Sequence, residues 1–293
     1  MFDGFELMTA TLPHAQLRLR YGGRGSPVLL LHGHPRTHTT WHRVAPLLAQ
    51  HHTVYCPDLR GFGRSSQPAD AEDHAGSSKR AKAEDCLALM RSFGCERFAV
   101  VGHDRGAYTA FRLAMDCPQV VSHLAILEAV PIIEALERCD ERFAQAWWHW
   151  FFFAQLEKPE RAILADPERW YRNSMAEMGE ENYQDYLQAI HDPAVIHGMM
   201  EDYRAGLTID RQHDAADRVA GRKIQCPLLC VWAEKDDLAA LYGDVLAVWR
   251  NWARHVEGQG MACGHHMAEE APEELTTILL EFLGRSDGGR KRR

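Results

Sequence analysis

Residues 98–106, FAVVGHDRG, give the strongest indication of the fold. Its first four residues form a short, continuous apolar run, which is typical of a buried parallel strand. Asp104 follows between two glycines, Gly102 and Gly106, and helical periodicity continues over 105–116. A strand, a glycine-flanked residue and a helix in this order predict a sharp turn that holds the Asp104 side chain above the edge of a sheet.

Similar strands and helices are expected on both sides of this turn. Further short apolar runs occupy residues 28–31, 53–55, 124–127 and 228–232, and each ends near Gly, Pro, Asp or Glu. Helical patterns lie between them, for example over 79–93, and Pro272 precedes a last helix near the C-terminus. This alternation predicts an α/β fold with a doubly wound, mostly parallel sheet.

The strand rhythm breaks after Pro131 and resumes at Ile224. Between them the chain is rich in Trp, Phe, Tyr, Glu and Arg and shows helical periodicity without a clear strand. We therefore expect a core domain formed by two segments, 1–131 and 212–285. A helical cap, 132–211, is inserted between them, and a flexible tail, 286–293, follows. A small-molecule site is expected in the cleft between core and cap.

Composition narrows the classes of partner. The 293 residues include 41 acidic and 33 basic side chains, for a net charge of −8, which argues against nucleic acid and membrane surfaces as partners. No apolar stretch has the length of a membrane span or of a signal h-region. The eight cysteines follow neither a disulfide nor a zinc-ligand spacing, Cys263 beside His265 and His266 included, so we expect reduced thiols, a cytoplasmic location, no metal and no cofactor.

Asp104 is predicted to be a catalytic nucleophile. The N-terminus of the following helix favours a carboxylate and keeps it ionised. A helix cap is the simpler alternative, but a cap does not need glycine on both sides directly after a strand. A carboxylate is a poor attacker of carbonyl groups and works instead on saturated carbon that bears a leaving group, where it forms an alkyl ester. Water then hydrolyses that ester, which requires a general base and an oxyanion hole.

The base and the oxyanion hole follow from chain order. His265 comes after the last strand-like stretch and before the final helix, where the histidine of a triad is expected, and the adjacent His266 is the local competitor. The oxyanion hole is expected from the backbone N–H groups of Arg105 and His34, because His34 follows the strand at 28–31.

The acid that orients the histidine has two candidates. Glu128 ends the strand at 124–127, and Asp236 follows the strand at 228–232. Both positions lie at the carboxyl ends of core strands, so chemistry alone leaves the choice between them open.

Several motifs together resemble the fluoroacetate (haloacetate) dehalogenases of the α/β-hydrolase superfamily. They are HGHP at 32–35, WHRVAP at 41–46, GHDRG at 102–106, WHW at 148–150, EDYRAG at 201–206, GH at 264–265 and EEAP at 269–272. The similarity runs over nearly the whole chain. The elbow motif is shared with epoxide hydrolases and haloalkane dehalogenases, whereas the Asp-Arg and His-Trp pairs are more specific to this family.

The resemblance implies a role for each matching residue. Asp104 would displace halide from the α-carbon of the substrate, and Arg105 would bind the substrate carboxylate. His149, Trp150 and Tyr203 would donate hydrogen bonds to the departing halide. The family pattern places the acid at Glu128, with Glu in place of the more usual Asp. The family also implies an enzyme without a cofactor and a homodimer.

The chain departs from the family pattern at several positions. Tyr108 stands where the family has a second arginine for the carboxylate. Two interpretations are open: Tyr108 supplies one hydrogen bond to the carboxylate, or it marks a different substrate that is larger or neutral. His34 replaces an apolar aromatic residue. The family's further cap tryptophan has no clear counterpart, because Trp170 comes early and Met175 and Met178 occupy the expected region.

Three functions compete at this point. The first is hydrolytic dehalogenation of fluoroacetate or chloroacetate to glycolate. The second is epoxide hydrolysis with the same nucleophile, base and acid, although Arg105 stands where epoxide hydrolases usually have Trp. The third is a non-enzymatic receptor on a hydrolase fold, which would have no need of a base.

Overall fold

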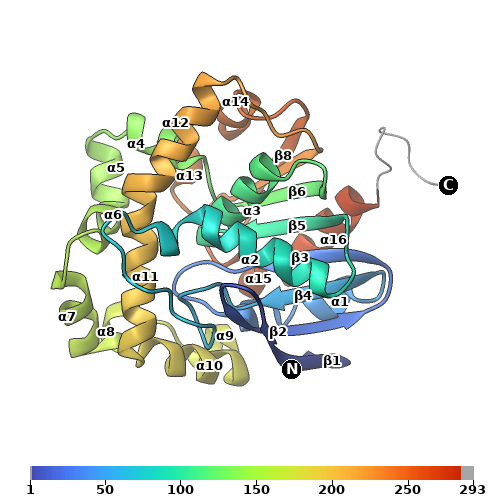
Figure 1. Ribbon diagram of the computed structural model, residues 1–293, viewed down its shortest axis with the longest axis horizontal. Helices are drawn as coiled ribbons and strands as arrows, with labels where there is room; N and C mark the ends of the chain where they lie inside the picture. The colour runs from blue at the N-terminus through green and yellow to red at the C-terminus, as the bar shows by residue number, and fades with distance from the viewer. Residues whose placement is uncertain (1, 285–293) are drawn as a thin grey trace.

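The structure, a computed structural model, describes residues 2–284 (Figure 1). One eight-stranded sheet runs through it in the order β1-β2-β4-β3-β5-β6-β7-β8. The strands are β1 (Phe5–Thr11), β2 (Gln16–Gly23), β3 (Ser26–Leu31), β4 (His52–Pro57), β5 (Phe98–His103), β6 (Val121–Leu127), β7 (Leu228–Ala233) and β8 (Val256–Met261). The predicted flexible tail, 286–293, lies outside the described residues.

The sheet is antiparallel only at its first edge. β1 pairs antiparallel with β2, and β2 pairs antiparallel with β4, whereas β4, β3, β5, β6, β7 and β8 run parallel to one another. The prediction of a mostly parallel sheet is confirmed. Because the six parallel strands share one direction, their carboxyl ends meet at one edge, where ligand sites of such sheets form.

Helices cover both faces of the sheet. Outside the inserted segment they are η1 (His38–Trp41), α1 (Ala45–Leu48), η2 (Ala75–Ser77), α2 (Lys79–Ser92), α3 (Arg105–Asp116), α13 (Leu238–Tyr242), α14 (Val245–Arg250), α15 (Met267–Glu270) and α16 (Pro272–Leu283). β5 is buried along its whole length. Val100 belongs to the apolar cluster that contains α2 and α3, and Val101 belongs to the cluster that contains α1 and α16. The sheet is therefore buried on both faces, which explains why its strands have continuous apolar runs.

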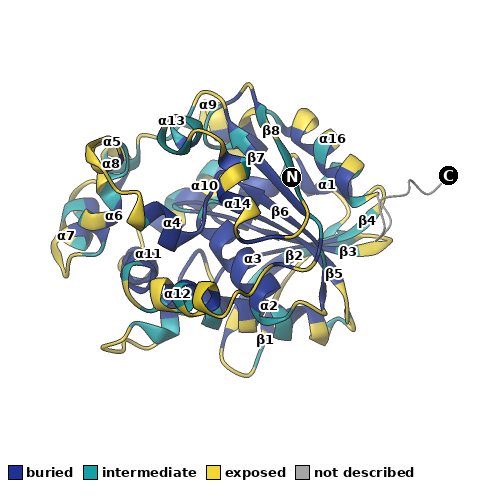
Figure 2. Ribbon diagram, turned by 90° about the horizontal axis from the view of Figure 1, so that it is seen from above, coloured by how far each residue is buried: buried dark blue, intermediate teal, exposed yellow. Residues whose placement is uncertain are grey.

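The segment between β6 and β7 consists of helices joined by short loops, with one isolated β-bridge at Ile224 before β7. It contains α4 (Ile132–Glu137), α5 (Glu141–Ala146), α6 (Trp148–Phe153), α7 (Lys158–Ala165), α8 (Pro167–Tyr171), α9 (Met175–Met178), α10 (Glu180–Ile190), α11 (Pro193–Ala205), the π-helical turn η3 (Gly206–Asp210) and α12 (Arg211–Val219). In Figure 1, α5 to α8 lie to the left of the sheet, and α11 stands between them and the sheet. Figure 2 shows many exposed residues on these outer helices and mostly buried ones along the strands. The assignment of 132–211 to a separate cap domain stays a prediction.

A buried ion pair ties this segment to the sheet domain. Glu269, in α15, accepts hydrogen bonds from Arg36 Nε and Nη2, both at 2.9 Å, and from Asn182 Nδ2 in α10 at 2.9 Å. Arg36 also donates to Asn173 Oδ1 at 3.0 Å. Arg36 is 2% exposed and Glu269 is 3% exposed. These contacts form a clamp, which we call the Arg36–Glu269 clamp, between the loop after β3, α15 and the inserted helices.

Two general properties follow from the described residues. None of the eight cysteines, all of which lie within the described residues, is in a disulfide, and five of them are buried. No helix in the described part of the chain combines the length and apolar character needed to cross a bilayer.

Candidate active site

Asp104 lies at the turn between β5 and α3. Its backbone has φ +49° and ψ −117°, a conformation that L residues rarely adopt. The turn depends on its glycines: a Cβ on Gly102 would lie 2.4 Å from the Gly106 carbonyl oxygen, and a Cβ on Gly106 would lie 2.4 Å from the Leu31 carbonyl oxygen. The two glycines thus let α3 start directly against β5 and β3, with Asp104 at the carboxyl edge of the sheet.

A backbone N–H group holds the Asp104 carboxylate in place. The N–H of His34 donates to Asp104 Oδ1 at 2.7 Å. Gly33 makes this approach possible, because a Cβ there would lie 2.4 Å from the same oxygen. Burial alone would raise the pKa of Asp104, but the charge of His265 and the His34 hydrogen bond contribute to a net pKa below the usual value. Asp104 is therefore ionised at neutral pH. The other expected backbone donor belongs to Arg105, the first residue of α3.

His265 pairs with Asp236. His265 Nδ1 donates to Asp236 Oδ2 at 2.7 Å. Asp236 follows β7 and His265 follows β8, so neighbouring parallel strands deliver both side chains to one edge of the sheet. Burial would lower the pKa of His265, but the hydrogen bond to Asp236 and the charge of Asp104 raise it to about 9. The imidazole is therefore positively charged at neutral pH while Asp104 is ionised.

Glu128 makes no hydrogen bond to His265 among the described residues, and the choice between Glu128 and Asp236 as the catalytic acid stays a prediction. Glu128 directly follows β6 with φ +53°, and its Oε2 accepts from the backbone N–H of Ala233. Its other oxygen is buried and has no hydrogen-bond partner among the described residues. Burial raises the pKa of Glu128 to about 8, so this carboxyl is largely protonated at pH 7. Glu128 thus turns to the end of β7, while Asp236 occupies the His265 Nδ1 position, which favours Asp236 as the acid.

The competing base, His266, lacks a carboxylate partner on its ring. Its Nδ1 is buried without a hydrogen-bond partner in the described part of the chain, and its ring stands at 88° to that of His265. Burial holds the pKa of His266 well below the usual value. His103, which sequence reasoning did not single out, donates from Nε2 to the His265 carbonyl oxygen at 2.8 Å. His103 thus fixes the backbone of the loop that carries His265.

Arg105 is buried and ion-paired with Asp202. Its Nε donates to Asp202 Oδ2, and its Nη2 donates to the Asp202 carbonyl oxygen at 3.0 Å. Its Nη1 is buried and has no hydrogen-bond partner within residues 2–284. Asp202 belongs to α11 and was absent from the predicted site. It lies inside the EDYRAG stretch, and nothing in the sequence links it to Arg105, 97 positions away.

The structure brings the expected halide donors together around Arg105. The guanidinium carbon lies 4.0 Å from the Tyr203 ring centroid, 5.2 Å from that of Tyr108 and 5.4 Å from that of Trp150. The His149 and Tyr203 rings are 6.0 Å apart. Burial lowers the pKa of His149 to about 4, so its imidazole is neutral at pH 7. Three side chains able to donate hydrogen bonds, from α6 and α11, thus meet beside the first residue of α3.

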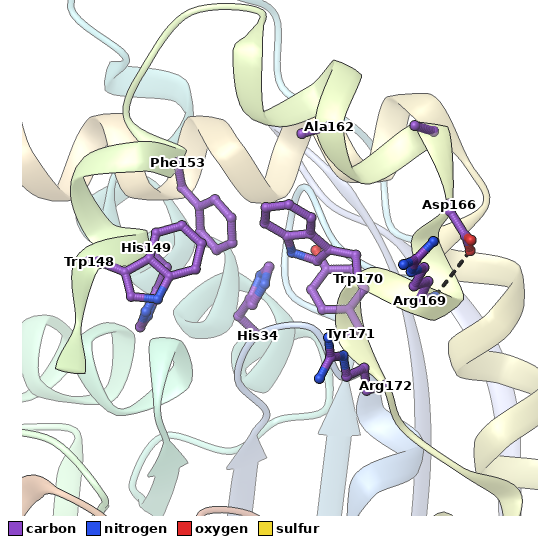
Figure 3. Close-up of a pocket in the computed structure, with 11 residues that line it drawn as sticks. His34, Trp148, His149, Phe153, Ala162, Asp166, Arg169, Trp170, Tyr171 and Arg172 are labelled. Atoms are coloured by element: carbon purple, nitrogen blue, oxygen red, sulfur yellow. Dashed lines mark hydrogen bonds between the residues drawn. The ribbon is translucent and has the colours of Figure 1, made fainter. Parts of the chain in front are cut away.

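A pocket of about 620 Å³ opens beside these residues (Figure 3). In Figure 3 the His34 ring stands between His149 and Phe153 on one side and Trp170 and Tyr171 on the other. His34 therefore reaches both places: its N–H binds Asp104, and its ring lines the pocket. Two tryptophans of the inserted segment, Trp148 and Trp170, line the pocket; Met178 is buried and Met175 is exposed, and neither lines it.

Three groups of side chains have potential metal-ligand atoms within 4.8 Å of one another among the described residues. They are His103 with His265 and His266, Glu128 with Asp236 and His265, and His38 with Asp58 and Asp185. Cys263 is in none of them. In the two groups that include His265, its Nδ1 is already engaged by Asp236.

Comparison with known proteins gives a consistent result. The profile of the alpha/beta hydrolase fold family matches residues 26–270. A fluoroacetate dehalogenase of Burkholderia sp is 40% identical over 99% of this chain and 97% of its own length. A soluble epoxide hydrolase of Corynebacterium sp. (strain C12) is 30% identical over 91% of this chain and 93% of its own. The crystal structure of ALR0039 from Nostoc sp PCC 7120, described as an alpha/beta hydrolase, superposes on this structure with a TM-score of 0.94. The two chains are 43% identical, and the superposition covers 98% of this chain and 100% of that chain.

Proposed function

The chain belongs to the alpha/beta hydrolase family, in the group of hydrolases that act on carbon–halide bonds, and we propose that it displaces halide from haloacetate-like acids and releases glycolate. The observation that carries the proposal is Arg105. This guanidinium directly follows Asp104, is 1% exposed and keeps one nitrogen without a partner among the described residues. A buried arginine with a free N–H suits a carboxylate on the substrate.

In the first step, Asp104 attacks the α-carbon of the substrate. We assign the attack to Oδ2, because Oδ1 accepts from the His34 N–H. The new C–O bond forms as the carbon–halogen bond breaks, and the halide leaves with the bonding electrons. His149, Trp150 and Tyr203 donate hydrogen bonds to the halide as its charge develops, which stabilises the transition state more than the ground state.

In the second step, water hydrolyses the ester on Asp104. Ester formation removes the Asp104 charge, which is one of the causes of the raised pKa of His265. The pKa of His265 therefore falls at this stage, and the imidazole releases its proton and becomes a general base. It takes a proton from water, which attacks the ester carbonyl carbon while the His34 and Arg105 N–H groups stabilise the oxyanion. The bond between this carbon and the glycolate oxygen then breaks, the glycolate oxygen takes the proton from His265, and the Asp104 carboxyl returns its own proton to His265. Asp236 holds the ring through Nδ1.

The test is halide release. Purified protein is incubated separately with fluoroacetate and chloroacetate, and halide and glycolate are measured. We expect both products from at least one haloacetate, none from Asp104→Asn, and a covalent ester on Asp104 in His265→Asn by mass spectrometry. Absence of halide from both haloacetates would refute the proposal, and normal turnover by His265→Asn would refute the assigned base.

Epoxide hydrolysis is the second candidate. Tyr203 is 1% exposed and lies within the same group of side chains, so its O–H is a suitable acid for an epoxide oxygen. The Corynebacterium relative supports the same alternative. Styrene oxide in the assay above separates the two functions: diol without halide release would establish epoxide hydrolysis and reject dehalogenation.

We also propose that the enzyme works in the cytoplasm as a homodimer. The free thiols support a reducing compartment. Trp148 and Phe151 are 50% and 38% exposed on α6, and large exposed aromatic residues of this kind often mark protein interfaces. Light scattering coupled to size-exclusion chromatography tests the dimer, and a monomer mass at micromolar concentration would contradict it.

A further inference from the structure

Asp202 is ion-paired with three cationic side chains, whereas a simple ion pair has one. This carboxylate is 0% exposed, and besides Arg105 it accepts hydrogen bonds from Lys79 Nζ at 2.9 Å and from Lys82 Nζ. Both lysines lie in α2 and are also buried, at 2% and 1% exposure. A buried charge is costly unless it is paired, so three buried cations around one carboxylate require an explanation.

The Asp202 contacts determine how Arg105 is presented. Asp202 binds the guanidinium through Nε and, by its backbone carbonyl, through Nη2. The Tyr203 ring lies against the same guanidinium, with its centroid 4.0 Å from the central carbon. Nη1 remains without a partner in the described structure. Asp202 therefore fixes the plane of the guanidinium and leaves one nitrogen for another acceptor.

The cluster around Asp202 holds one more cation than carboxylates, and the ionised Asp104 beside Arg105 balances this surplus. Lys79 also binds Asp210, with its backbone N–H at 2.8 Å from Oδ1 and its Nζ at 3.3 Å from Oδ2. The cluster thus contains the cations Arg105, Lys79 and Lys82 and the carboxylates Asp202 and Asp210. The free Arg105 nitrogen remains a donor for a second anion, and the surplus cation of the cluster offsets the repulsion between that anion and the ionised Asp104.

We propose that Asp202 is the positioning residue that makes this site selective for anionic substrates. Its carboxylate orients Arg105 toward the substrate carboxylate, and its place in α11 sets the adjacent residue, Tyr203, beside the departing halide. Lys82 keeps the cluster positive after Asp202 has neutralised one cation. This inference rests on the proposed function, and it identifies a determinant of substrate charge that touches neither the substrate nor the halide.

The same helix offers a matched control. Arg112 lies in α3, two turns after Arg105, and it pairs with Asp217, which is 2% exposed and also binds Arg222. Asp217→Asn therefore removes a buried carboxylate from a multiply paired arginine of α3, as Asp202→Asn does, but away from Asp104. A general loss of packing affects both variants, whereas altered substrate selectivity affects only the first.

The experiment compares chloroacetate with chloroacetamide, which has the same carbon–chlorine bond but no charge. We expect Asp202→Asn to lower kcat/KM for chloroacetate about 10–100-fold more than for chloroacetamide, mainly through KM. Asp202→Glu should recover part of the loss. Asp217→Asn should leave the ratio of the two substrates unchanged. Equal losses for both substrates in Asp202→Asn would overturn the proposal and leave Asp202 a purely structural role.

Product binding separates this inference from the proposed function. Glycolate is titrated into the wild type, Asp202→Asn and Lys82→Met, the last of which keeps the Arg105–Asp202 pair and removes the surplus charge. We expect weaker glycolate binding in both variants. If the wild type binds glycolate but releases no chloride, the proposed function fails and the anion site stands. If Lys82→Met binds glycolate as the wild type does, the inference is wrong even where Asp202→Asn fails to fold.

Discussion

The pKa of His265 depends on the charges of the residues around it. Its pKa of about 9 reflects two negative charges, those of Asp236 and Asp104, acting against burial. In the proposed reaction, one of these charges disappears when the ester forms and returns when the ester is hydrolysed. The histidine is therefore an acid in the free enzyme and a base in the intermediate, and the reaction itself switches it between the two states.

The two carboxyl groups near His265 are predicted to differ in their effect on activity. Asp236→Asn removes the negative charge that stabilises the protonated ring and fixes its tautomer, so kcat for halide-releasing turnover should fall by about 10²–10⁴. Glu128→Gln keeps an acceptor for the Ala233 N–H and should lower kcat by no more than about tenfold. A larger loss in Glu128→Gln than in Asp236→Asn would restore Glu128 as the catalytic acid.

Glu128 should make the stability of the protein depend on pH. Its folded pKa of about 8 lies above the usual value near 4.5, so the folded state binds more protons than the unfolded state between those values. Its contribution therefore falls as pH rises from about 4.5 to 8, by about 1.4 kcal/mol for each pKa unit of difference. Urea unfolding at pH 5 and pH 8 measures this. Glu128→Gln should show a smaller loss of stability across the window, and an unchanged loss would reject the raised pKa.

The elbow between β5 and α3 concentrates backbone strain at one position. Asp104 has φ +49°, a conformation that costs an L residue about 1–3 kcal/mol. The glycines on either side cannot relax it, because both are in close contact with backbone atoms of other segments. The surrounding turn therefore holds the nucleophile in a conformation that it would leave if it were free.

A pair of inactive variants should reveal that strain. Asp104→Gly and Asp104→Ala both remove the carboxylate, but only glycine adopts a positive φ without cost. We expect Asp104→Gly to be more stable than Asp104→Ala by about 1 kcal/mol in denaturant unfolding. Equal stability of the two variants would mean that the turn does not impose strain at this residue.

The elements differ in how well the sequence predicts them. The buried parallel strands and α2, α3 and α16 were predictable, because apolar runs and helical spacing mark them. β8 was missed because its sequence, VEGQGM, contains two glycines; a Cβ on Gly258 would lie 2.0 Å from the Cys230 carbonyl oxygen, so close strand approach excludes a larger residue. The edge strand β1 was also missed. Most of its residues are exposed, so it has no apolar run.

The candidate site was predictable only in part. Motif spacing indicated Asp104 and His265, because the carboxyl ends of parallel strands converge. The choice between Glu128 and Asp236 depends on side-chain torsions and on one bond to the Ala233 N–H, for which the sequence carries no signal. The Arg105–Asp202 pair joins positions far apart in the chain, so it could not be predicted from the sequence either.

At the scale of the whole molecule, the site is divided between the sheet and the inserted helices. The sheet supplies Asp104, Asp236 and His265, and α6 and α11 supply His149, Trp150 and Tyr203. The Arg36–Glu269 clamp is one of the connections that fix the two parts relative to each other. The geometry around the substrate therefore depends on contacts away from the reacting atoms.

Breaking the clamp should destabilise the protein strongly. Glu269→Ala leaves Arg36 buried without its main partner, which we expect to cost about 3–5 kcal/mol in unfolding free energy. Glu273→Ala, an exposed residue at the start of α16, is the control and should change stability by less than about 0.5 kcal/mol. Thermal unfolding followed by circular dichroism measures both variants. Equal melting temperatures would show that the clamp does not stabilise the fold.

The two carboxyl groups beside His265 also have an evolutionary meaning. The charge of Asp236 is one of the causes that keep Glu128 protonated, so loss of Asp236 would ease the ionisation of Glu128. A lineage that carries both groups can therefore transfer the acid from the end of one strand to the end of its neighbour through intermediates that keep some activity. Descendants with the acid at either position would then share one ancestor, and the position of the acid alone would be a poor guide to their relationships.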